Sequence, residues 1–61
     1  MTLQEKMLEY RAKNRISQGE LAERCGVSKQ TIHSIENGLQ TPSKVTEVKI
    51  RLVVDNEKED G

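Results

Sequence analysis

The side chains best suited to recognition chemistry lie in one short segment, residues 29–37, KQTIHSIEN. Lys29 can donate hydrogen bonds to guanine O6 and N7, Gln30 can pair with adenine N6 and N7, and Ser34 can bond to either base. If the segment is a helix, a step of about 100° per residue puts Gln30, Ser34 and Asn37 on the face away from its isoleucines. Lys29 then lies in the exposed first turn. Polar residues on an exposed helix often have no role, so the elements around them must decide whether they bind anything.

Other reactive chemistry is not evident in the sequence. Cys25 and His33 are the single cysteine and the single histidine, so no disulfide can form within the chain and no zinc site can be assembled from them. We expect Cys25, at an inner helix position, to be a buried structural thiol. There are no paired carboxylates for acid–base catalysis, no nucleophile beside a base and no phosphate-binding loop. The sequence predicts no catalytic residue, no metal site, no cofactor and no small-molecule ligand.

Helix-start signals indicate which helices position residues 29–37. A Ser or Thr followed three residues later by Glu can form a capping box, in which each side chain hydrogen bonds to the backbone of the other residue. Two such boxes predict helices over 3–13 and 18–25, and Ser28 is a suitable N-cap for a third helix over 29–37. Gly26 ends the second helix, because glycine readily adopts a positive φ. The two boxes are Thr2 with Glu5 and Ser17 with Glu20.

The second and third helices, with the glycine between them, match a helix-turn-helix over residues 18–37. This motif needs a small residue where its helices cross, which Ala22 supplies, and a glycine at the turn, which Gly26 supplies. It also needs apolar residues at its inner positions. These are Leu21, Cys25, Val27, Ile32 and Ile35. The sequence therefore predicts a mainly α-helical, compact domain of three or four helices built around this motif.

The stretch ISQGELAERCGVSKQTIHSIENG, followed by PS, resembles the helix-turn-helix domains of phage Cro and repressor proteins, the XRE family. The resemblance covers about residues 6–43. In that family the second helix of the motif lies in the major groove of DNA, and the N-terminus of the first helix meets the DNA backbone. The resemblance implies base reading by Lys29, Gln30 and Ser34. It implies backbone or flanking contacts by Gln18, Thr31, His33 and Asn37.

Three further expectations concern residues around the motif. The resemblance implies that Arg11 and Glu36 form a partly buried ion pair, which ties the first helix to the recognition helix. Gln18 stands at a helix N-terminus, where free backbone N–H groups and the helix dipole favour a phosphate. Lys44 could add a contact with the DNA backbone, and such contacts position a protein without reading sequence.

Charge divides the chain into two parts. The tail, residues 55–61, DNEKEDG, holds four acidic residues and one lysine, a net charge of −3, so the chain of net charge zero carries +3 on residues 1–54. We expect residues 1–54 to form the DNA-binding domain and the tail to be disordered. The N-terminus lacks the features of a signal peptide, and no stretch approaches a membrane span. The sequence predicts a cytoplasmic protein without a membrane partner.

Residues 46–55, TEVKIRLVVD, carry a different pattern, in which apolar and polar residues alternate. Alternation is typical of a strand with one apolar face, and the many β-branched residues also favour a strand. The apolar face would contain Val48, Ile50, Leu52 and Val54. A helix is the alternative, with Ser43 as its N-cap and with Val45, Val48 and Leu52 on one face. We predict a C-terminal β-strand.

This strand suggests how the protein assembles and acts. We predict that it pairs antiparallel with its copy across a two-fold axis, which makes residues 44–54 a dimerisation segment. The leading function is a sequence-specific transcriptional regulator, a phage or bacterial repressor that binds double-stranded DNA at a pseudo-palindromic operator as a homodimer. The alternative is an antitoxin-type interaction module whose C-terminal segment adds a strand to a partner protein. An enzyme is not expected.

Overall fold

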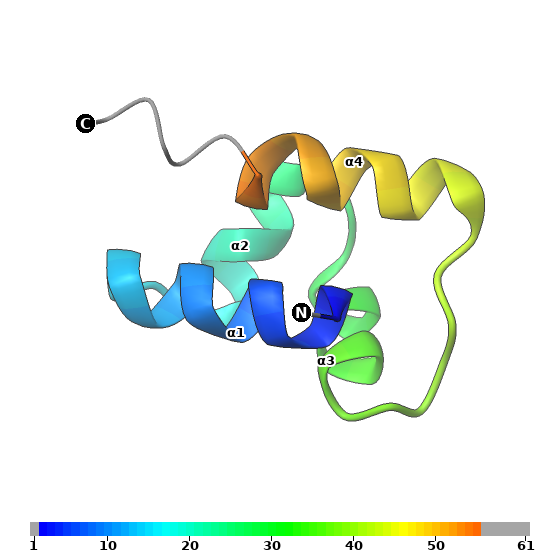
Figure 1. Cartoon of the computed structure of the whole chain (residues 1–61), viewed down its shortest axis with the longest axis horizontal. Helices are drawn as coiled ribbons and strands as arrows, with labels where there is room; N and C mark the ends of the chain where they lie inside the picture. Colours follow the sequence, from blue (N-terminus) through cyan, green and yellow to red (C-terminus); the bar gives the residue numbers. More distant parts are fainter. Residues whose placement is uncertain (1, 56–61) are drawn as a thin grey trace.

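The computed structural model describes residues 2–55, which contain four helices joined by short turns and loops (Figure 1). They are α1 Leu3–Asn14, α2 Gln18–Cys25, α3 Lys29–Glu36 and α4 Lys44–Val54. In Figure 1, α4 lies along the top of the domain and α3 lies towards the bottom. No strand occurs within residues 2–55, so the prediction of a mainly α-helical domain is confirmed there. Apart from Asp55, the predicted acidic tail lies outside the described residues.

Each helix begins at a Thr or Ser whose side chain caps it. At Thr2 the full capping box forms: the Glu5 N–H donates to the Thr2 hydroxyl at 3.2 Å, and the Thr2 N–H donates to Glu5 Oε1 at 3.0 Å. At Ser17 the structure shows the serine half of the predicted box, with the Glu20 N–H donating to Ser17 Oγ at 3.1 Å. The Glu20 carboxylate lies 3.5 Å from Arg24 Nε instead. The four caps are Thr2, Ser17, Ser28 and Ser43.

The helices meet in one apolar core, to which each contributes a fully buried side chain. These four are Met7 from α1, Leu21 from α2, Ile32 from α3 and Ile50 from α4. Buried apolar residues around them include Tyr10, Ala22, Cys25, Ile35 and Val54. Burial raises the pKa of the Cys25 thiol. Because the thiolate is the reactive form, this shift makes Cys25 less reactive, as expected of a structural thiol.

The C-terminal segment forms α4, so the predicted strand is wrong. Ile50 and Val54, one helical turn apart, are buried, whereas Val48 and Leu52 are exposed. A strand would have placed all four side chains on one face. The alternative prediction, a helix capped by the preceding serine, is the one that forms. The face that it assigned to Val45, Val48 and Leu52 exists, but it is exposed to solvent rather than packed on the core.

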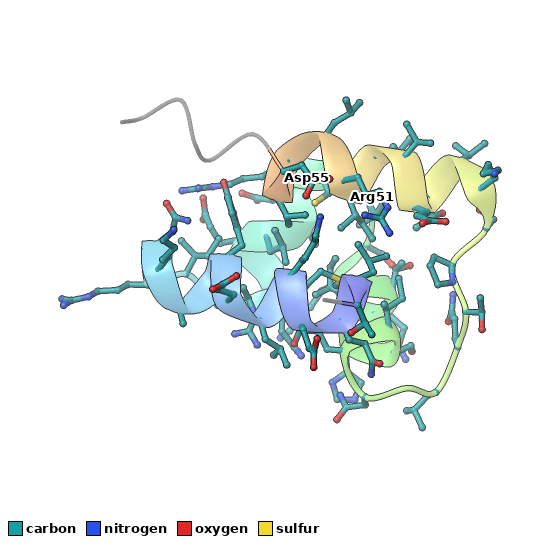
Figure 2. The ribbon with its side chains drawn as sticks, in the orientation of Figure 1. Arg51 and Asp55 are labelled. Carbon is teal, nitrogen blue, oxygen red and sulfur yellow. The ribbon has the colours of Figure 1, made fainter. Side chains whose placement is uncertain are left out.

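Ion pairs along α4 and the packing of its buried face on the core stabilise the helix. Arg51 Nε lies 2.9 Å from Glu47 Oε2, and Arg51 Nη1 lies 3.8 Å from Asp55 Oδ2, each one turn apart along α4 (Figure 2). Asp55 also accepts a hydrogen bond from Lys6 Nζ at 2.7 Å, which links the end of α4 to α1. Exposed pairs of this kind each contribute well under about 1 kcal/mol. The packing of Ile50 and Val54 on the core therefore contributes more to the docking of α4 than these pairs do.

Gly19 lies in the first turn of α2, where glycine costs up to about 1 kcal/mol relative to alanine. A Cβ at this position would lie 3.8 Å from Ser17 Oγ and 3.9 Å from Lys29 Cδ, both ordinary contacts. We therefore expect Gly19→Ala to raise the free energy of unfolding by about 0.5–1 kcal/mol in urea denaturation. Gly26→Ala is the matched control: its φ of 75° strains any other residue, so it should lose about 1 kcal/mol. Equal effects of the two changes would contradict this account.

Candidate nucleic-acid interface

The turn between α2 and α3 fixes how α3 is presented. α2 ends at Gly26, which adopts a left-handed conformation and lets the chain turn sharply. The Val27 N–H then donates to the Ala22 carbonyl at 3.0 Å, and Ser28 caps α3 directly afterwards. Ala22 is buried, as a position between two packed helices requires. α3 therefore starts at the surface, with its first residues exposed.

The start of α3 lies beside the start of α2, and the two enclose a shallow depression. Its lining consists of Gln18 from α2 and of Lys29, Gln30 and His33 from α3. The three residues of α3 are exposed, and Gln18 is partly exposed. The structure thus brings four of the predicted DNA-contacting residues together from two helices. Their amide and imidazole groups and the Lys29 charge suit contact with base edges and phosphates.

Ser34 does not lie on the exposed face of α3, contrary to the prediction. Its relative exposure is 7%. The chain turns back directly after α3 at Gly38, whose φ is 71°, and the Leu39 N–H donates to the Ser34 carbonyl at 2.8 Å. We attribute the burial to this returning chain and to the small size of a serine side chain, which its neighbours easily cover. A side chain this buried is not available to contact a base edge.

An ion pair shielded from solvent holds α3 against α1. Arg11 donates to both carboxylate oxygens of Glu36, from Nε at 2.9 Å and from Nη2 at 2.8 Å. The Glu36 side chain is only 3% exposed, so these bonds form largely out of contact with water. Gln4 of α1 also donates from Nε2 to the Glu36 carbonyl at 3.1 Å. Sequence reasoning missed Gln4, because a glutamine in the first turn of a helix carries no signal of such a contact.

Gln18 joins the same network, which changes how it can meet DNA. Its Nε2 donates to Glu36 Oε1 at 2.9 Å, so this side-chain donor is engaged within the protein. The Ser17 hydroxyl accepts from the Glu20 N–H, and a helix start leaves the preceding N–H groups, those of Gln18 and Gly19, without intrahelical acceptors. A phosphate at this place would be bound by backbone N–H groups and by the helix dipole.

The remaining predicted contact residues lie in less favourable places. Thr31 is half-buried, and its hydroxyl hydrogen bonds with the Ser28 hydroxyl at 2.9 Å. Asn37 donates from Nδ2 to the His33 carbonyl at 2.8 Å, at the end of α3. Lys44 is exposed, but it begins α4 and does not line the depression. These positions suit contacts with the DNA backbone better than base reading.

Two other kinds of site are not found in the described part of the chain. No group of three or more His, Cys, Asp and Glu side chains within residues 2–55 could hold a metal ion. None of the four helices is long and apolar enough to cross a membrane.

Comparison with known proteins bears on the same surface. A family model described as Helix-turn-helix matches residues 7–50, which is most of the chain. No curated protein and no solved structure matches the chain. The family consists of DNA-binding regulators of the Cro and C1 type and is not a family of enzymes. The chain therefore belongs to the XRE family of helix-turn-helix proteins and is a DNA-binding transcription regulator of that type.

Proposed function

We propose that the chain is a repressor that binds a pseudo-palindromic operator as a homodimer, with α3 of each copy in the major groove. The observation that carries the proposal is the exposed start of α3 beside the start of α2. Lys29 offers donors for guanine O6 and N7, and Gln30 offers the donor and acceptor that adenine N6 and N7 require. The start of α2 would bind a phosphate through its N–H groups, with His33 flanking the groove.

A fixed position of α3 supports base reading of this kind. Hydrogen bonds to base edges are directional, so a recognition helix that shifts by an ångström loses them. The pair between Arg11 and Glu36 holds α3 on α1, and Gln18 extends the same network to α2. Two helices, α1 and α2, thus restrain the one that we propose reads DNA.

Two copies are required by the energetics of recognition. Each good bidentate base contact gives about 1–3 kcal/mol of discrimination, too little for one module to find its site among the many of a genome. Two copies on two half-sites add their contacts, and a two-fold axis between them makes the site pseudo-palindromic. A protein bound across a promoter in this way would exclude the transcription machinery, which is repression.

The antitoxin-type alternative depends on strand addition, which α4 does not support. Strand addition uses N–H and C=O groups along an extended segment. In α4 these groups are bonded within the helix. We therefore propose DNA binding as the function of this domain.

Selection of bound sequences from a random DNA library tests the proposed function. We expect two inverted half-sites, each with neighbouring guanine and adenine preferences, whose centres lie about 34 Å apart along the duplex. A selected site without inverted symmetry would contradict the homodimer, and no enrichment at all would contradict sequence-specific binding. A reporter gene with the selected site at its promoter should then be expressed less when the protein is present.

Gln30→Ala should relax base preference at one position of each half-site. Losing one bidentate contact lowers the ratio of operator affinity to random-DNA affinity by about tenfold per half-site. Because Gln30 is uncharged, the salt dependence of binding should stay nearly unchanged. Fluorescence anisotropy at several salt concentrations measures both quantities. Gln40→Ala, at an exposed position between α3 and α4, is the matched control. Equal losses on operator and random DNA would show that Gln30 does not read bases.

A further inference from the structure

α4 carries two apolar faces, and only one of them packs on the core. Ile50 and Val54 are buried, whereas Val45, Val48 and Leu52 have relative exposures of 66%, 48% and 63%. At about 100° per residue, these last three lie within roughly 60° of one another, on the side opposite Ile50. We call them the outer face of α4. Large apolar side chains gathered on an exposed surface are typical of an interaction site.

The spacing of the outer face indicates what kind of surface it fits. Positions i, i+3 and i+7 are the a, d and a positions of a heptad, the seam along which two helices pair. This seam is narrower than the stripe of at least about 100° with which a helix packs on a globular core. The outer face therefore fits one further helix.

We propose that α4 pairs antiparallel with α4 of a second copy, across a two-fold axis beside Val48. In this arrangement Val45 of one copy packs against Leu52 of the other, and the two Val48 side chains meet near the axis. The seam is then complementary to itself, as an interface with two-fold symmetry must be. The inference rests on the proposed function in one respect, the need to join two recognition helices.

Charges beside the outer face favour the antiparallel direction. Lys44 and Asp55, at the two ends of α4, lie on the same side of the seam, so antiparallel pairing brings Lys44 of one copy near Asp55 of the other. Lys44 is in the first turn, where the dipole of its own helix disfavours a cation, and the C-terminal end of the second α4 would offset this. Asp55 already accepts from Lys6 at 2.7 Å and would be shared. A parallel pair would put both Lys44 side chains at one end and both Asp55 side chains at the other, on opposite sides of the seam, so neither would gain an opposite charge.

The outer face is small, so the association should be weak in solution. α4 has 11 residues and is about 16 Å long, and the pair covers less than the roughly 1,200–2,000 Å² of a typical stable interface. The two Lys49 side chains also approach each other on the far side of the seam, which weakens the pair further. When both copies bind one operator, their effective concentration rises, and the dimer should then form fully.

The position of the outer face suits two recognition helices on one duplex. α4 and α3 lie on opposite sides of the domain (Figure 1), which measures 21 Å across each of its two shorter axes. An axis on the outer face of α4 can therefore set each α3 about 17 Å away, half of the roughly 34 Å between successive major-groove half-sites.

Charge exchange tests both the pairing and its direction. In Lys44→Glu alone, or in Asp55→Lys alone, like charges meet across the axis, so the dimer dissociation constant from sedimentation equilibrium should rise about tenfold. In an equal mixture of these two variants, opposite charges face each other at both ends. The mixed dimer should therefore form with about the affinity of the wild type. A mixture no tighter than either variant alone would overturn the antiparallel pairing.

A second variant separates dimerisation from DNA binding. Val48→Lys places two cations beside the axis and should remove both the dimer and cooperative binding to the full operator, while binding to a single half-site is retained. Gln40→Lys adds the same charge at an exposed loop position and is the matched control for DNA affinity gained from charge alone. Circular dichroism of Val48→Lys checks that the helices remain. Wild-type protein that stays monomeric at every concentration, or Val48→Lys protein that still binds the full operator cooperatively, would overturn the proposal. If the wild-type protein does not bind a single half-site, that result would instead contradict the proposed function.

Discussion

Arg11→Met is expected to lower the free energy of unfolding by about 3 kcal/mol, because it leaves a buried carboxylate without its cation. Glu36 is 3% exposed at its side chain and would lose two charge-assisted hydrogen bonds of 2.8 and 2.9 Å. The Gln18 amide, at 2.9 Å, would still donate to it. Methionine keeps most of the length and apolar contact of arginine, so the change reports mainly on the ion pair. Urea denaturation of the variant and the wild type measures the loss.

The matched control for this change is Arg51→Met. Arg51 lies 2.9 Å from the Glu47 carboxylate, as close as Arg11 lies to Glu36, but these two side chains are 40% and 36% exposed. An exposed pair contributes about 0–1 kcal/mol, so this variant should be nearly as stable as the wild type. Arg11→Met combined with Glu36→Gln should also be more stable than Arg11→Met alone, since no charge is then left buried. Equal losses in Arg11→Met and Arg51→Met would contradict the importance of burial.

The size of this effect matters for a domain of 61 residues. Such a domain has a free energy of unfolding of roughly 3–9 kcal/mol, so a loss of about 3 kcal/mol leaves a substantial unfolded fraction. Introducing Arg11→Met into the more stable Gly19→Ala background keeps the measurement possible. The loss would measure the cost of an unpaired buried carboxylate, and the same pair holds α3 against α1.

Helix starts and the central motif could be predicted because their determinants are local. A capping serine or threonine and its bonded N–H are three residues apart, and the turn at Gly26 depends on the conformation of that single residue. The family resemblance rests on the same short-range pattern, and the match over residues 7–50 confirms it. The exposed start of α3 followed from this pattern. The burial of Ser34 did not, since it depends on the chain that returns after Gly38.

The C-terminal segment was misassigned because α4 has apolar residues on two opposite faces. Val48 and Leu52 lie on one face and Ile50 and Val54 on the other. Along the sequence these two pairs interleave, and the result has the period of two that is typical of a strand. The β-branched residues strengthened the wrong interpretation, because their preference for strands is weak and packing overrides it. Which face meets the core is decided by the other helices, and the segment itself does not contain that information.

Ile50→Ala is expected to lower the free energy of unfolding by about 2–5 kcal/mol, because it opens a cavity where α4 meets the other helices. Ile50 is fully buried and is the residue that α4 contributes to the centre of the core. Loss of its side chain removes both apolar burial and close packing, and so small a core has little capacity to compensate. Thermal or urea unfolding measures the effect, at a protein concentration low enough for the chain to be monomeric.

A chemically matched pair of variants then distinguishes the helix from the strand. Val54→Ala and Val48→Ala delete the same atoms, but Val54 is 4% exposed and Val48 is 48% exposed. In a strand the two residues share a face and would lose similar stability. In the helix they lie on different faces, so Val54→Ala should cost about 1–2 kcal/mol and Val48→Ala less than about 0.5 kcal/mol. Equal losses would support a strand over a helix. The outer face, on which the proposed helix pairing depends, would then not exist.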